Sequence, residues 1–469
     1  MKYFLAIDIG ASSGRHIVGW LDNGKLNTEE VYRFTNGAEQ RSGRLCWNAD
    51  KLFDEILNGL VKAKEAGKAP TYVGIDTWAV DYALLDGSDN RIGEVYCYRD
   101  NRTAQHIDSV HRIVPFDELY SRTGIQFQPF NTVYQLYDDK VSGKLNGAKS
   151  FLMLPDYLNF LLTGVKKQEY TNATSTGLVN ATTHTWDKDI CDMLGLKSDL
   201  FGDLTQPGTT VGNFKQEIAD KLGYTATVVL PATHDTASAV IATPLEAQTP
   251  YISSGTWSLL GVEQNEAHTD KQSQLVNYSN EGGPNFTFRY QKNIMGLWII
   301  QSVKRELKDE YTFPQLAQCA QSQPSGELID VNDNRFLAPK SMCDEIDNAV
   351  GKKLSIAKRM RVIYDSLALS YATAIKELEH NTQQTYDTIN IIGGGSRDKF
   401  LNELTAQATG KKIIAGPIEA TAIGNLAMQM IGTGEIKDIS TARKIIKQSF
   451  EINIEGLPQK ITRGIKCTN

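Results

Sequence analysis

The sequence predicts an α/β fold with two domains, on three observations. Short apolar runs rich in Ile and Val alternate with helical stretches, a pattern typical of sheets covered by helices. A chain of 469 residues is too long for one hydrophobic core and corresponds to about two to three domains. Segments 4–15 and 251–262 share a strand, a turn of small hydroxyl residues with glycine, and an alternating strand. This repetition favours a duplicated domain, with a boundary near residue 243, before the turn residues Pro244 and Pro250.

The predicted first domain begins with FLAIDIGASSGR at 4–15. Residues 15–32 continue it as a hairpin, because Asn23-Gly24 is a strong signal for a two-residue turn. A helix is expected at 49–65. The run TYVGIDTWAVDYALL at 71–85 reads as a strand that ends in a turn, and residues 237–242 read as a buried helix.

The predicted second domain begins with YISSGTWSLLGV at 251–262. Helical patterns follow at 295–307 and 361–380. Residues 389–404, INIIGGGSRDKFLNEL, run from a strand through three glycines into an amphipathic helix. Glycines at such a point let a flat base and a ribose approach the backbone; a plain strand-to-helix turn is the alternative.

The composition is ordinary for a globular protein, with 41% hydrophobic and 22% charged residues. The formal net charge is −6, and Lys and Arg occur only in short clusters such as 352–353 and 411–412, so we expect no nucleic-acid partner. No window approaches the roughly 18 apolar residues of a membrane span, and the apolar run at the N-terminus is too short for a signal peptide. These features predict a cytoplasmic protein that does not contact a membrane.

The six cysteines are scattered and form neither a C-x-x-C motif nor a metal-type pairing with histidine. They are Cys46, Cys97, Cys191, Cys319, Cys343 and Cys467. This distribution is typical of reduced thiols in a cytoplasm.

The stretch GASSGR at 10–15 matches the G-x-S-x-G pattern of hydrolase nucleophile elbows, but its context excludes that interpretation. An elbow requires a helix after the serine, whereas an alternating strand follows here. A hydroxyl- and glycine-rich turn between two strands presents backbone N–H groups to an anion such as phosphate, and Arg15 adds positive charge. The alternative is a plain tight hairpin.

No standard nucleotide motif is present. The nearest approach to a Walker A loop, GWLDNGKL at 19–26, has Leu26 where a hydroxyl residue is needed. No protein-kinase motif set occurs either. If the protein binds ATP, the glycines at 393–395 offer the route.

The third motif is THDT at 233–236. Asp235 either caps the helix that follows or acts as a general base toward a hydroxyl group. We expect the adjacent side chains of His234 and Asp235 to point to opposite faces and not to pair. Asp8 ends the first strand, where a Mg²⁺–phosphate unit needs a carboxylate; the alternative is an aspartate that bonds to its own turn.

Together these motifs resemble the FGGY carbohydrate kinases of the actin/hexokinase/Hsp70 superfamily, and among them the rhamnulokinases. The motifs are AIDIGASSGR, GIDTWAVDYALL, YRDNRT, TGIQFQPFNTVYQL, LMLPDYLNFLLTG, EYTNATSTGLVN, HDTASAV, SSGTWSLLG, NIMGLWIIQ and IIGGGS. They occur in the family's order from residue 4 to about residue 430. The resemblance implies two ribonuclease-H-like (actin/hexokinase-type) domains, 1–243 and 244–469, flanking a catalytic cleft.

The resemblance also implies a set of site residues. Those expected to bind ATP are Ala11, Ser12, Ser13, Gly14, Arg15, Thr256, Gln301 and Gly394. Those expected to bind the sugar are Ala79, His234, Asp235, Thr236 and Asn293. Asp235 matches the family's catalytic base, and Asp8 is the expected Mg²⁺ ligand. Ala79 stands where the family pattern has glycine, and Asn293 has an alternative role as the N-cap of helix 295–307.

The implied activity is ATP-dependent phosphorylation of L-rhamnulose at its C1 hydroxyl, in L-rhamnose catabolism, with ATP and Mg²⁺ as cofactors. The expected partners are these small molecules, with no nucleic acid and no membrane, for a monomer or a small homo-oligomer. Another FGGY ketose kinase, a fuculokinase or a xylulokinase, is the nearest alternative. A chaperone-like member of the superfamily, which binds ATP without a sugar, and a serine hydrolase are the other classes considered.

Overall fold

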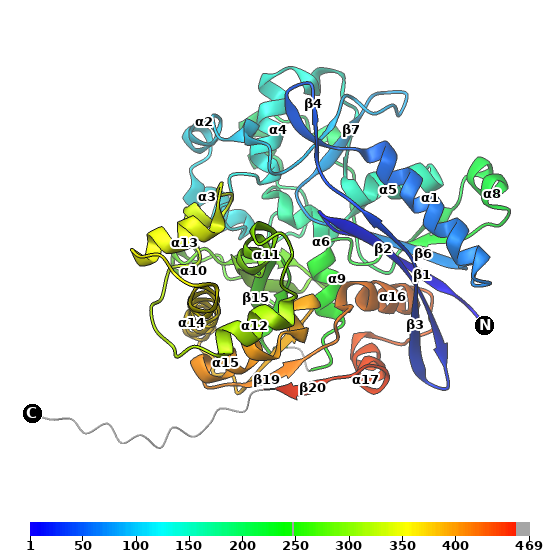
Figure 1. The fold of residues 1–469 in the computed structure, drawn as a ribbon. Helices are drawn as coiled ribbons and strands as arrows, with labels where there is room; N and C mark the ends of the chain where they lie inside the picture. Colours follow the sequence, from blue (N-terminus) through cyan, green and yellow to red (C-terminus); the bar gives the residue numbers. More distant parts are fainter. Residues whose placement is uncertain (246–247, 456–469) are drawn as a thin grey trace, which may run out of the picture. The chain divides into compact units, whose positions relative to one another are not determined.

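The computed structural model describes residues 1–245 and 248–455 and is drawn as a ribbon in Figure 1. The chain divides into two compact units. The first unit comprises Met1–Gln248, Val262–Lys292 and Glu419–Phe450, and the second comprises Thr249–Gly261, Asn293–Ile418 and the residues from Glu451 onward. Each unit contains a sheet with helices, so the predicted α/β class is confirmed.

The first unit is built on a six-stranded sheet in the order β12-β13-β6-β1-β2-β3. The strands are β1 Phe4–Ile9, β2 Ser13–Asp22, β3 Lys25–Thr35, β6 Tyr72–Thr77, β12 Thr210–Asn213 and β13 Thr227–Val229. β1 is antiparallel to β2 and parallel to β6, and β6 is parallel to β13. The predicted hairpin turn is confirmed, because Asn23 and Gly24 have φ values of 49° and 76°, as a two-residue turn requires.

Helices cover both faces of this sheet, as Figure 1 shows. α1 (Ala49–Glu65) begins where predicted, because the side chain of Asn48 accepts a hydrogen bond from the amide of Lys51. α1 packs on β2 and β3, and α5 (Leu154–Thr163) packs on β6. The other face is covered by α16 (Ala420–Gly432), which packs on β1 and β6 and against α9 (Asp235–Ile241).

The first unit has further elements around these layers. A second hydrophobic core lies between the antiparallel strand pair β7 and β9 and helices α2, α3, α4 and α7. Their bounds are β7 Tyr82–Leu85, β9 Ser150–Met153, α2 Ile107–Ile113, α3 Phe116–Thr123, α4 Thr132–Val141 and α7 Lys188–Leu194. The remaining elements are β4 Glu39–Arg41, β5 Arg44–Trp47, β8 Val95–Tyr96, β10 Gln168–Glu169, β11 Leu204–Thr205, α6 Tyr170–Ala173, α8 Gln216–Leu222, α10 Lys271–Leu275, β16 Ser279–Gly282, β17 Phe288–Met295 (which ends in the second unit) and α17 Ile439–Ser449.

The second unit is built on strands that pair in the order β15, β14, β18, β19 and β20. They are β14 Tyr251–Ser254, β15 Trp257–Gln264 (which ends in the first unit), β18 Thr388–Ile392, β19 Lys412–Ala415 and β20 Asn453–Glu455. The helices are α11 Trp298–Glu306, α12 Phe313–Gln321, α13 Met342–Val350, α14 Ile356–Thr382 and α15 Lys399–Thr409. The helix expected at 295–307 therefore begins at Trp298, and the one expected at 361–380 extends further at both ends.

The two sheets repeat one topology. β1 is antiparallel to β2 and parallel to β6, and β14 is likewise antiparallel to β15 and parallel to β18. The next strand along, β13 or β19, is parallel in both cases. This agreement supports the interpretation of a duplicated domain. The boundary at 243/244 stays a prediction. Residues 262–292 and 419–450 follow it in sequence, and the compact unit that contains them is the first.

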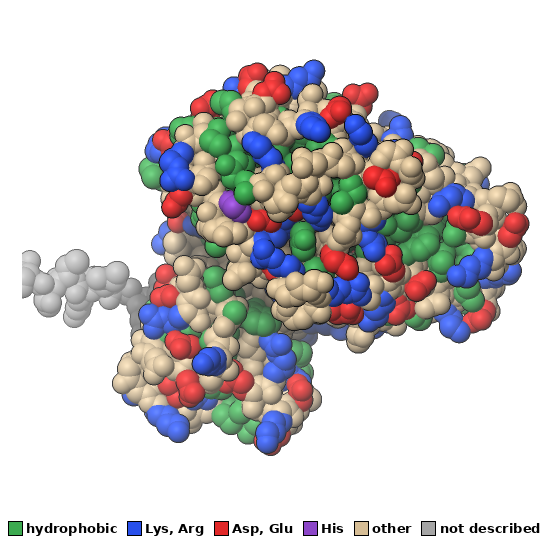
Figure 2. All heavy atoms as spheres, turned by 90° about the horizontal axis from the view of Figure 1, so that it is seen from above, with side chains coloured by type: hydrophobic (Ala, Val, Ile, Leu, Met, Phe, Trp, Pro, Cys, Tyr) green, Lys and Arg blue, Asp and Glu red, His purple; other side chains and the backbone are tan. Residues whose placement is uncertain are grey.

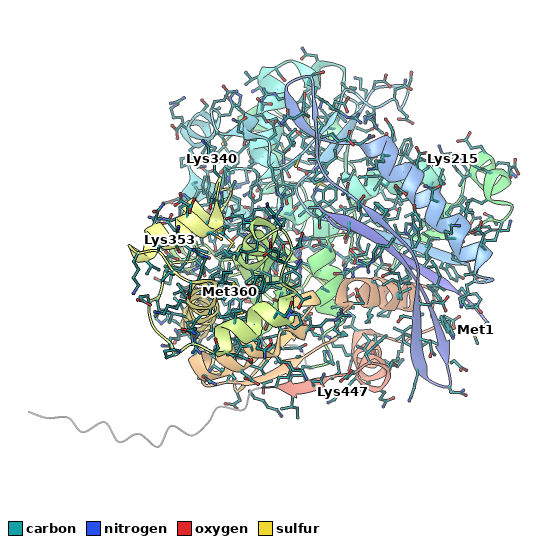
Figure 3. The ribbon with its side chains drawn as sticks, viewed as in Figure 1. Met1, Lys215, Lys340, Lys353, Met360 and Lys447 are labelled. Carbon is teal, nitrogen blue, oxygen red and sulfur yellow. The ribbon has the colours of Figure 1, made fainter. Side chains whose placement is uncertain are left out.

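The structure also bears on the hydropathy, the cysteines and the charged residues of the sequence. Within the part of the chain that the structure describes, no helix has the length and hydropathy needed to cross a membrane. The cysteines at 46, 97, 191, 319 and 343 are free, and Cys467 lies outside the described residues. On the face drawn in Figure 2, acidic and basic side chains are interspersed. Lys352 and Lys353 are exposed, and Figure 3 labels the second of them.

Candidate active site

Two aspartates lie side by side at the ends of β1 and β6. Asp8 and Asp76 are partners in the parallel pairing of these strands, and Asp8 also lies opposite Arg15 in β2. Both aspartates are buried. The sequence prediction included Asp8 but missed Asp76, although AIDIG and GIDTW place an aspartate at the same point of each strand. That parallel was the signal that could have identified it.

Charges surround Asp8. Arg15 donates from Nε to Asp8 Oδ2 at 2.9 Å and pairs through its Nη1 with Glu419. Burial raises the pKa of Asp8, the positive charge of Arg15 opposes that rise, and the negative charge of Asp235 adds to it. Asp235 therefore lies close enough to act electrostatically on the pair at the strand ends.

Asp76 is held by α16. Asn425 on that helix donates from Nδ2 to Asp76 Oδ2 and, at 3.1 Å, to the carbonyl oxygen of Gly74. Burial and the charge of Asp8 raise the pKa of Asp76 well above its usual value, against the hydrogen bond from Asn425. Oδ1 of Asp76 is buried and has no hydrogen-bond partner among the described residues. The Asp76 carboxylate is thus held in place through Oδ2, while its Oδ1 is available to a ligand.

The turn between β1 and β2 has a fixed shape. Gly10 donates its amide to Ser13 O at 2.9 Å, and Asn36 bonds to both sides of the turn, from its amide to Ser12 O (3.0 Å) and from Nδ2 to Gly10 O (2.9 Å). Ser12 is exposed, and Ala11 beside it is half-buried. This arrangement presents small and hydroxyl residues outward on a rigid loop.

Gly14 is required at the base of this turn. A Cβ atom there would lie 2.2 Å from the ring of Phe34, too close without displacing the ring. Phe34 belongs to the core under the sheet. Gly14 is therefore needed for packing, whatever else it does for a ligand.

The THDT segment is bonded to the end of β6. Thr77 donates its amide to Thr233 O at 2.9 Å, and Thr77 and His234 form a parallel bridge. Glu169, which is fully buried, accepts from the amide of Thr233 at 3.1 Å and from its hydroxyl at 2.7 Å. These bonds fix the start of α9 beside Asp76.

Asp235 is the first residue of α9 and not its N-cap. The N-cap residue is His234, and its side chain makes no capping bond. The one hydrogen bond to the Asp235 side chain among the described residues comes from the hydroxyl of Thr236, which donates to Oδ1 at 3.0 Å. The Asp235 side chain is 32% exposed. The structure therefore gives no support to the capping interpretation of Asp235.

His234 and Asp235 approach each other, and the expectation that they point apart is wrong. His234 Nε2 lies 3.5 Å from Asp235 Oδ1. The expectation assumed one continuous strand, but His234 has extended backbone angles (φ −78°, ψ 119°) and α9 begins at the next residue. Because the backbone direction changes between them, the alternation of side chains in a strand does not apply.

The loop after β6 holds a strained residue beside Ala79. The amide of Asp81 donates to Ala79 O at 2.9 Å, which closes a γ-turn around Val80 with φ of 67°. A β-branched residue with positive φ is rare and costs about 1–3 kcal/mol. Such strain persists where the surroundings fix the backbone, and it is common at ligand-binding loops.

Asp81 supplies that fixation. Its Oδ2 accepts from the indole N–H of Trp47 at 2.6 Å, from that of Trp78 at 2.9 Å and from the amide of Tyr98 at 3.1 Å. Burial raises the pKa of Asp81 to about 6, and these donors oppose the rise. The Trp47 and Trp78 rings also pack against each other, with centroids 4.1 Å apart. The loop that presents Ala79 is therefore rigid.

In the second unit, the β14–β15 turn lies between glycines. A Cβ on Gly296 would lie 2.7 Å from Thr256 O, and a Cβ on Gly395 would lie 2.0 Å from Ser254 Oγ. The start of α11 is bonded to the turn, because Trp298 donates its amide to Thr256 O at 3.2 Å. Close backbone approach on both sides thus sets the position of Thr256.

The other residues predicted in the second unit lie on elements that contact this turn. Gln301 is on the first turn of α11 and is half-buried. Gly394 is exposed, and a Cβ there would meet nothing within 4 Å. Asn293 lies in β17, with a buried Oδ1 that has no partner among the described residues. Its alternative role as an N-cap is wrong, because the N-cap of α11 is Leu297.

The predicted residues therefore form one group in each unit. The group in the first unit follows the ends of β1 and β6 and the start of α9: Asp8, Ala11, Ser12, Ser13, Gly14, Arg15, Ala79, His234, Asp235 and Thr236. The group in the second unit surrounds the β14–β15 turn and α11: Thr256, Asn293, Gln301 and Gly394.

The donors at the strand ends fit a magnesium ion that is shared with phosphate. Among the described residues, no three His, Cys, Asp or Glu side chains are arranged to hold a metal by themselves. Mg²⁺ in phosphate-transfer sites is usually bound through one or two carboxylates together with phosphate oxygens and water. Asp8 and the uncommitted Oδ1 of Asp76 match that smaller donor set.

The sequence of this chain matches a known protein family and several named proteins. Residues 3–242 match the profile of the N-terminal domain of the FGGY family of carbohydrate kinases, and residues 250–433 match that of its C-terminal domain. A protein named rhamnulokinase from Oceanobacillus iheyensis is 47% identical, with 96% of this chain and 97% of the relative covered. The rhamnulokinase of Bacillus subtilis is 45% identical, with 96% and 94% covered.

Solved structures give the same fold at much lower identity. A ligand-bound xylulose kinase from Lactobacillus acidophilus has a TM-score of 0.82 and 16% identity, and the match covers 98% of this chain and 94% of the other. A Plasmodium falciparum glycerol kinase with ADP has a TM-score of 0.77 and 13% identity, with 97% and 94% covered. At this identity the likeness concerns the fold, and it confirms the two-domain architecture predicted from the sequence.

Proposed function

Because the chain belongs to the FGGY family of carbohydrate kinases, we propose that it transfers the γ-phosphoryl group of ATP to L-rhamnulose. The products are L-rhamnulose 1-phosphate and ADP. The observation that most strongly supports this substrate is the near-full-length identity of 45–47% to relatives named rhamnulokinase. The solved kinases, at 13–16% identity, favour no particular sugar.

Asp235 is the proposed general base. Its Oδ1 accepts from Thr236, its side chain is part-exposed, and the THDT segment is bonded to β6 through Thr77. In the reaction, Asp235 takes the proton of the C1 hydroxyl while that oxygen bonds to the γ-phosphorus and the bond from the γ-phosphorus to the ADP oxygen breaks. The proton ends on Asp235 and the electron pair of the broken bond on ADP.

The nucleotide is assigned to the turns. Residues 11–15 offer hydroxyl and backbone groups together with the guanidinium of Arg15, which suits phosphate oxygens. In the second unit, the proposed nucleotide residues are Thr256, Gln301 and Gly394. Asp8, with Asp76, would hold Mg²⁺, which when bound offsets the negative charge of the phosphates.

A direct test is ADP release in the presence of ATP and Mg²⁺. The comparison is between L-rhamnulose, L-fuculose, D-xylulose and no sugar, at matched concentrations. Strong stimulation by L-rhamnulose alone is the expected result. Stimulation by another ketose would move the substrate assignment but keep the carbohydrate kinase, and no sugar-dependent release would contradict the proposal.

Two neighbouring glycines give a matched test of the nucleotide assignment. A methyl group at Gly394 enters open space, whereas at Gly395 it meets Ser254 Oγ at 2.0 Å. Gly394→Ala should change the free energy of unfolding by less than about 0.5 kcal/mol and raise the KM for ATP several-fold. Gly395→Ala should destabilise by about 1–3 kcal/mol through overpacking. Urea unfolding and ATP titrations measure both, and an unchanged KM in Gly394→Ala would remove that residue from the nucleotide site.

A further inference from the structure

Behind His234 lies a buried charged pair that the proposed chemistry does not use. Glu281 in β16 and Arg289 in β17 are directly opposite in the antiparallel pairing of these strands. Arg289 Nη2 donates to Glu281 Oε2 at 3.1 Å, and its Nε donates to Gly282 O at 3.2 Å. His234 Nδ1 lies 3.0 Å from the same Glu281 oxygen and 3.1 Å from Arg289 Nη2.

Burying the charged side chains of Arg289 and Glu281 costs desolvation free energy. The side chains of Arg289 and Glu281 are 2% and 8% exposed, and Nη1 of Arg289 has no partner among the described residues. A buried ion pair often stabilises a protein no more than apolar residues of the same volume would. Stability alone therefore does not explain why the Arg289–Glu281 pair lies beside His234.

The surroundings of Glu281 favour its ionised form. Burial raises the pKa of Glu281, but the charge of Arg289 and the hydrogen bond with His234 outweigh it and lower the pKa to about 2. An ionised carboxylate is an acceptor only, so at 3.0 Å it favours a proton on Nδ1 of His234. The other tautomer would set the Nδ1 lone pair against this carboxylate. It would gain a hydrogen bond from Arg289 Nη2 at 3.1 Å, but that nitrogen already donates to Glu281 Oε2.

A proton on Nδ1 leaves a lone pair on Nε2. His234 Nε2 lies 3.5 Å from Asp235 Oδ1. In this tautomer both atoms are hydrogen-bond acceptors. Two acceptors at this spacing do not bond to each other but can each accept from hydroxyl groups of one ligand. A polyhydroxylated sugar supplies such donors.

We infer that Glu281 and Arg289 are positioning residues that hold His234 in the Nδ1–H tautomer, so that Nε2 accepts a hydrogen bond from a ketose hydroxyl beside the one that Asp235 deprotonates. The inference rests on the proposed function for the identity of the ligand. It adds a determinant of sugar affinity that lies one layer behind the sugar-binding residues. Neither Glu281 nor Arg289 touches the reacting atoms.

The first experiment reads the tautomer directly. Nitrogen-15 NMR of the full chain labelled at histidine distinguishes Nδ1–H from Nε2–H, and the signals of His234 are identified by their loss in His234→Gln. The expected result in the wild-type protein without sugar is a proton on Nδ1. A proton on Nε2, alone or together with one on Nδ1, would overturn the inference, because Nε2 could then not accept a hydrogen bond. This reading does not depend on which ketose is the substrate, so it stands apart from any failure of the proposed function.

The second experiment separates positioning from structure by kinetics. Glu281→Gln should raise the KM for the ketose that the wild-type enzyme phosphorylates by about tenfold, the scale of one lost hydrogen bond, with the KM for ATP unchanged. Glu281→Asp keeps the charge and should recover part of the loss. Tyr134→Phe, which removes the hydroxyl 2.8 Å from His111 Nε2 elsewhere in the first unit, is the matched control and should leave both KM values unchanged.

These kinetic outcomes decide the question only if the variant is folded. Circular dichroism and thermal unfolding test whether it is. A folded Glu281→Gln with an unchanged KM for the sugar would overturn the inference. If Glu281→Gln does not fold, the tautomer measured in the wild-type protein and the KM of Glu281→Asp decide instead.

Discussion

Replacing Asp235 with asparagine is expected to lower the turnover number at least about a hundredfold, the usual scale for loss of a general base. Asparagine keeps the size of the side chain and can keep an acceptor toward Thr236, but it cannot take the proton of the sugar hydroxyl. Sugar and ATP should still bind, so the loss should fall on turnover. Steady-state kinetics and calorimetric titrations with each substrate measure the two quantities separately.

Asp108→Asn is a suitable control, because Asp108 also lies in the first turn of a helix and is exposed. It tests the small effect, about 0.3–1 kcal/mol, of losing a negative charge near a helix N-terminus. Turnover should be unchanged in this variant. The stability of Asp235→Asn should also stay within about 1 kcal/mol of wild type, because the structure shows no capping bond from Asp235. Near-normal turnover in Asp235→Asn would remove it from the chemistry.

Local patterns were enough to predict much of the fold. The turn at Asn23-Gly24, helix α1 and the two matching hairpins follow from signals within about ten to twenty neighbouring residues, and all occur where expected. The glycine-rich step from β18 to α15 is present too. Elements of this kind are set by periodicity and turn chemistry, which a single sequence displays.

Long-range relations were not visible in the same way. The segment 419–450 packs in the first unit, although it follows the predicted boundary by more than one hundred residues. Nothing in its composition marks that destination, because an apolar helix fits any sheet of suitable width. Glu281 and Arg289 were missed for a similar reason, since their role depends on a strand pairing that sets them beside His234.

Within the candidate site, the sequence predicted residue types better than geometry. Asp8 and Asp235 were proposed from the end of a strand and the start of a helix, and the structure places both at those points; their roles stay predictions. The contact between His234 and Asp235 was missed, because its prediction depended on the residue at which α9 begins. Asp76 was missed because it was considered as part of a strand, and its neighbour in space belongs to another strand.

Helix α16 connects the two strand-end aspartates to Asp235. Asn425 on this helix bonds to Asp76, and the preceding residue, Gly424, packs against α9. A Cβ on Gly424 would lie 1.7 Å from the carbonyl oxygen of Ser238, one turn after Asp235. The absence of a side chain at Gly424 therefore sets how closely the helix that begins with Asp235 approaches the helix that holds Asp76.

Gly424→Ala should accordingly damage both stability and catalysis. Because the obstructing atom is backbone, one helix must shift, with an expected loss of about 1–3 kcal/mol in the free energy of unfolding. The shift displaces Asp235 or Asn425, and a misplacement of about 1 Å can cost up to a hundredfold in rate. Urea unfolding, and turnover measured per folded molecule, test the two effects.

Two other glycines separate these effects. Gly432→Ala, at the far end of α16, places a Cβ 2.1 Å from Gly208 O, so it should destabilise to a similar extent while the folded fraction keeps its turnover. Gly37→Ala meets nothing within 4 Å and should change neither quantity. Turnover lost equally in Gly424→Ala and Gly432→Ala would mean that the rate follows general stability. Turnover lost in Gly424→Ala alone would show that the rate depends on the spacing of α9 and α16. Of the two variants, only Gly424→Ala disturbs the contact between these helices.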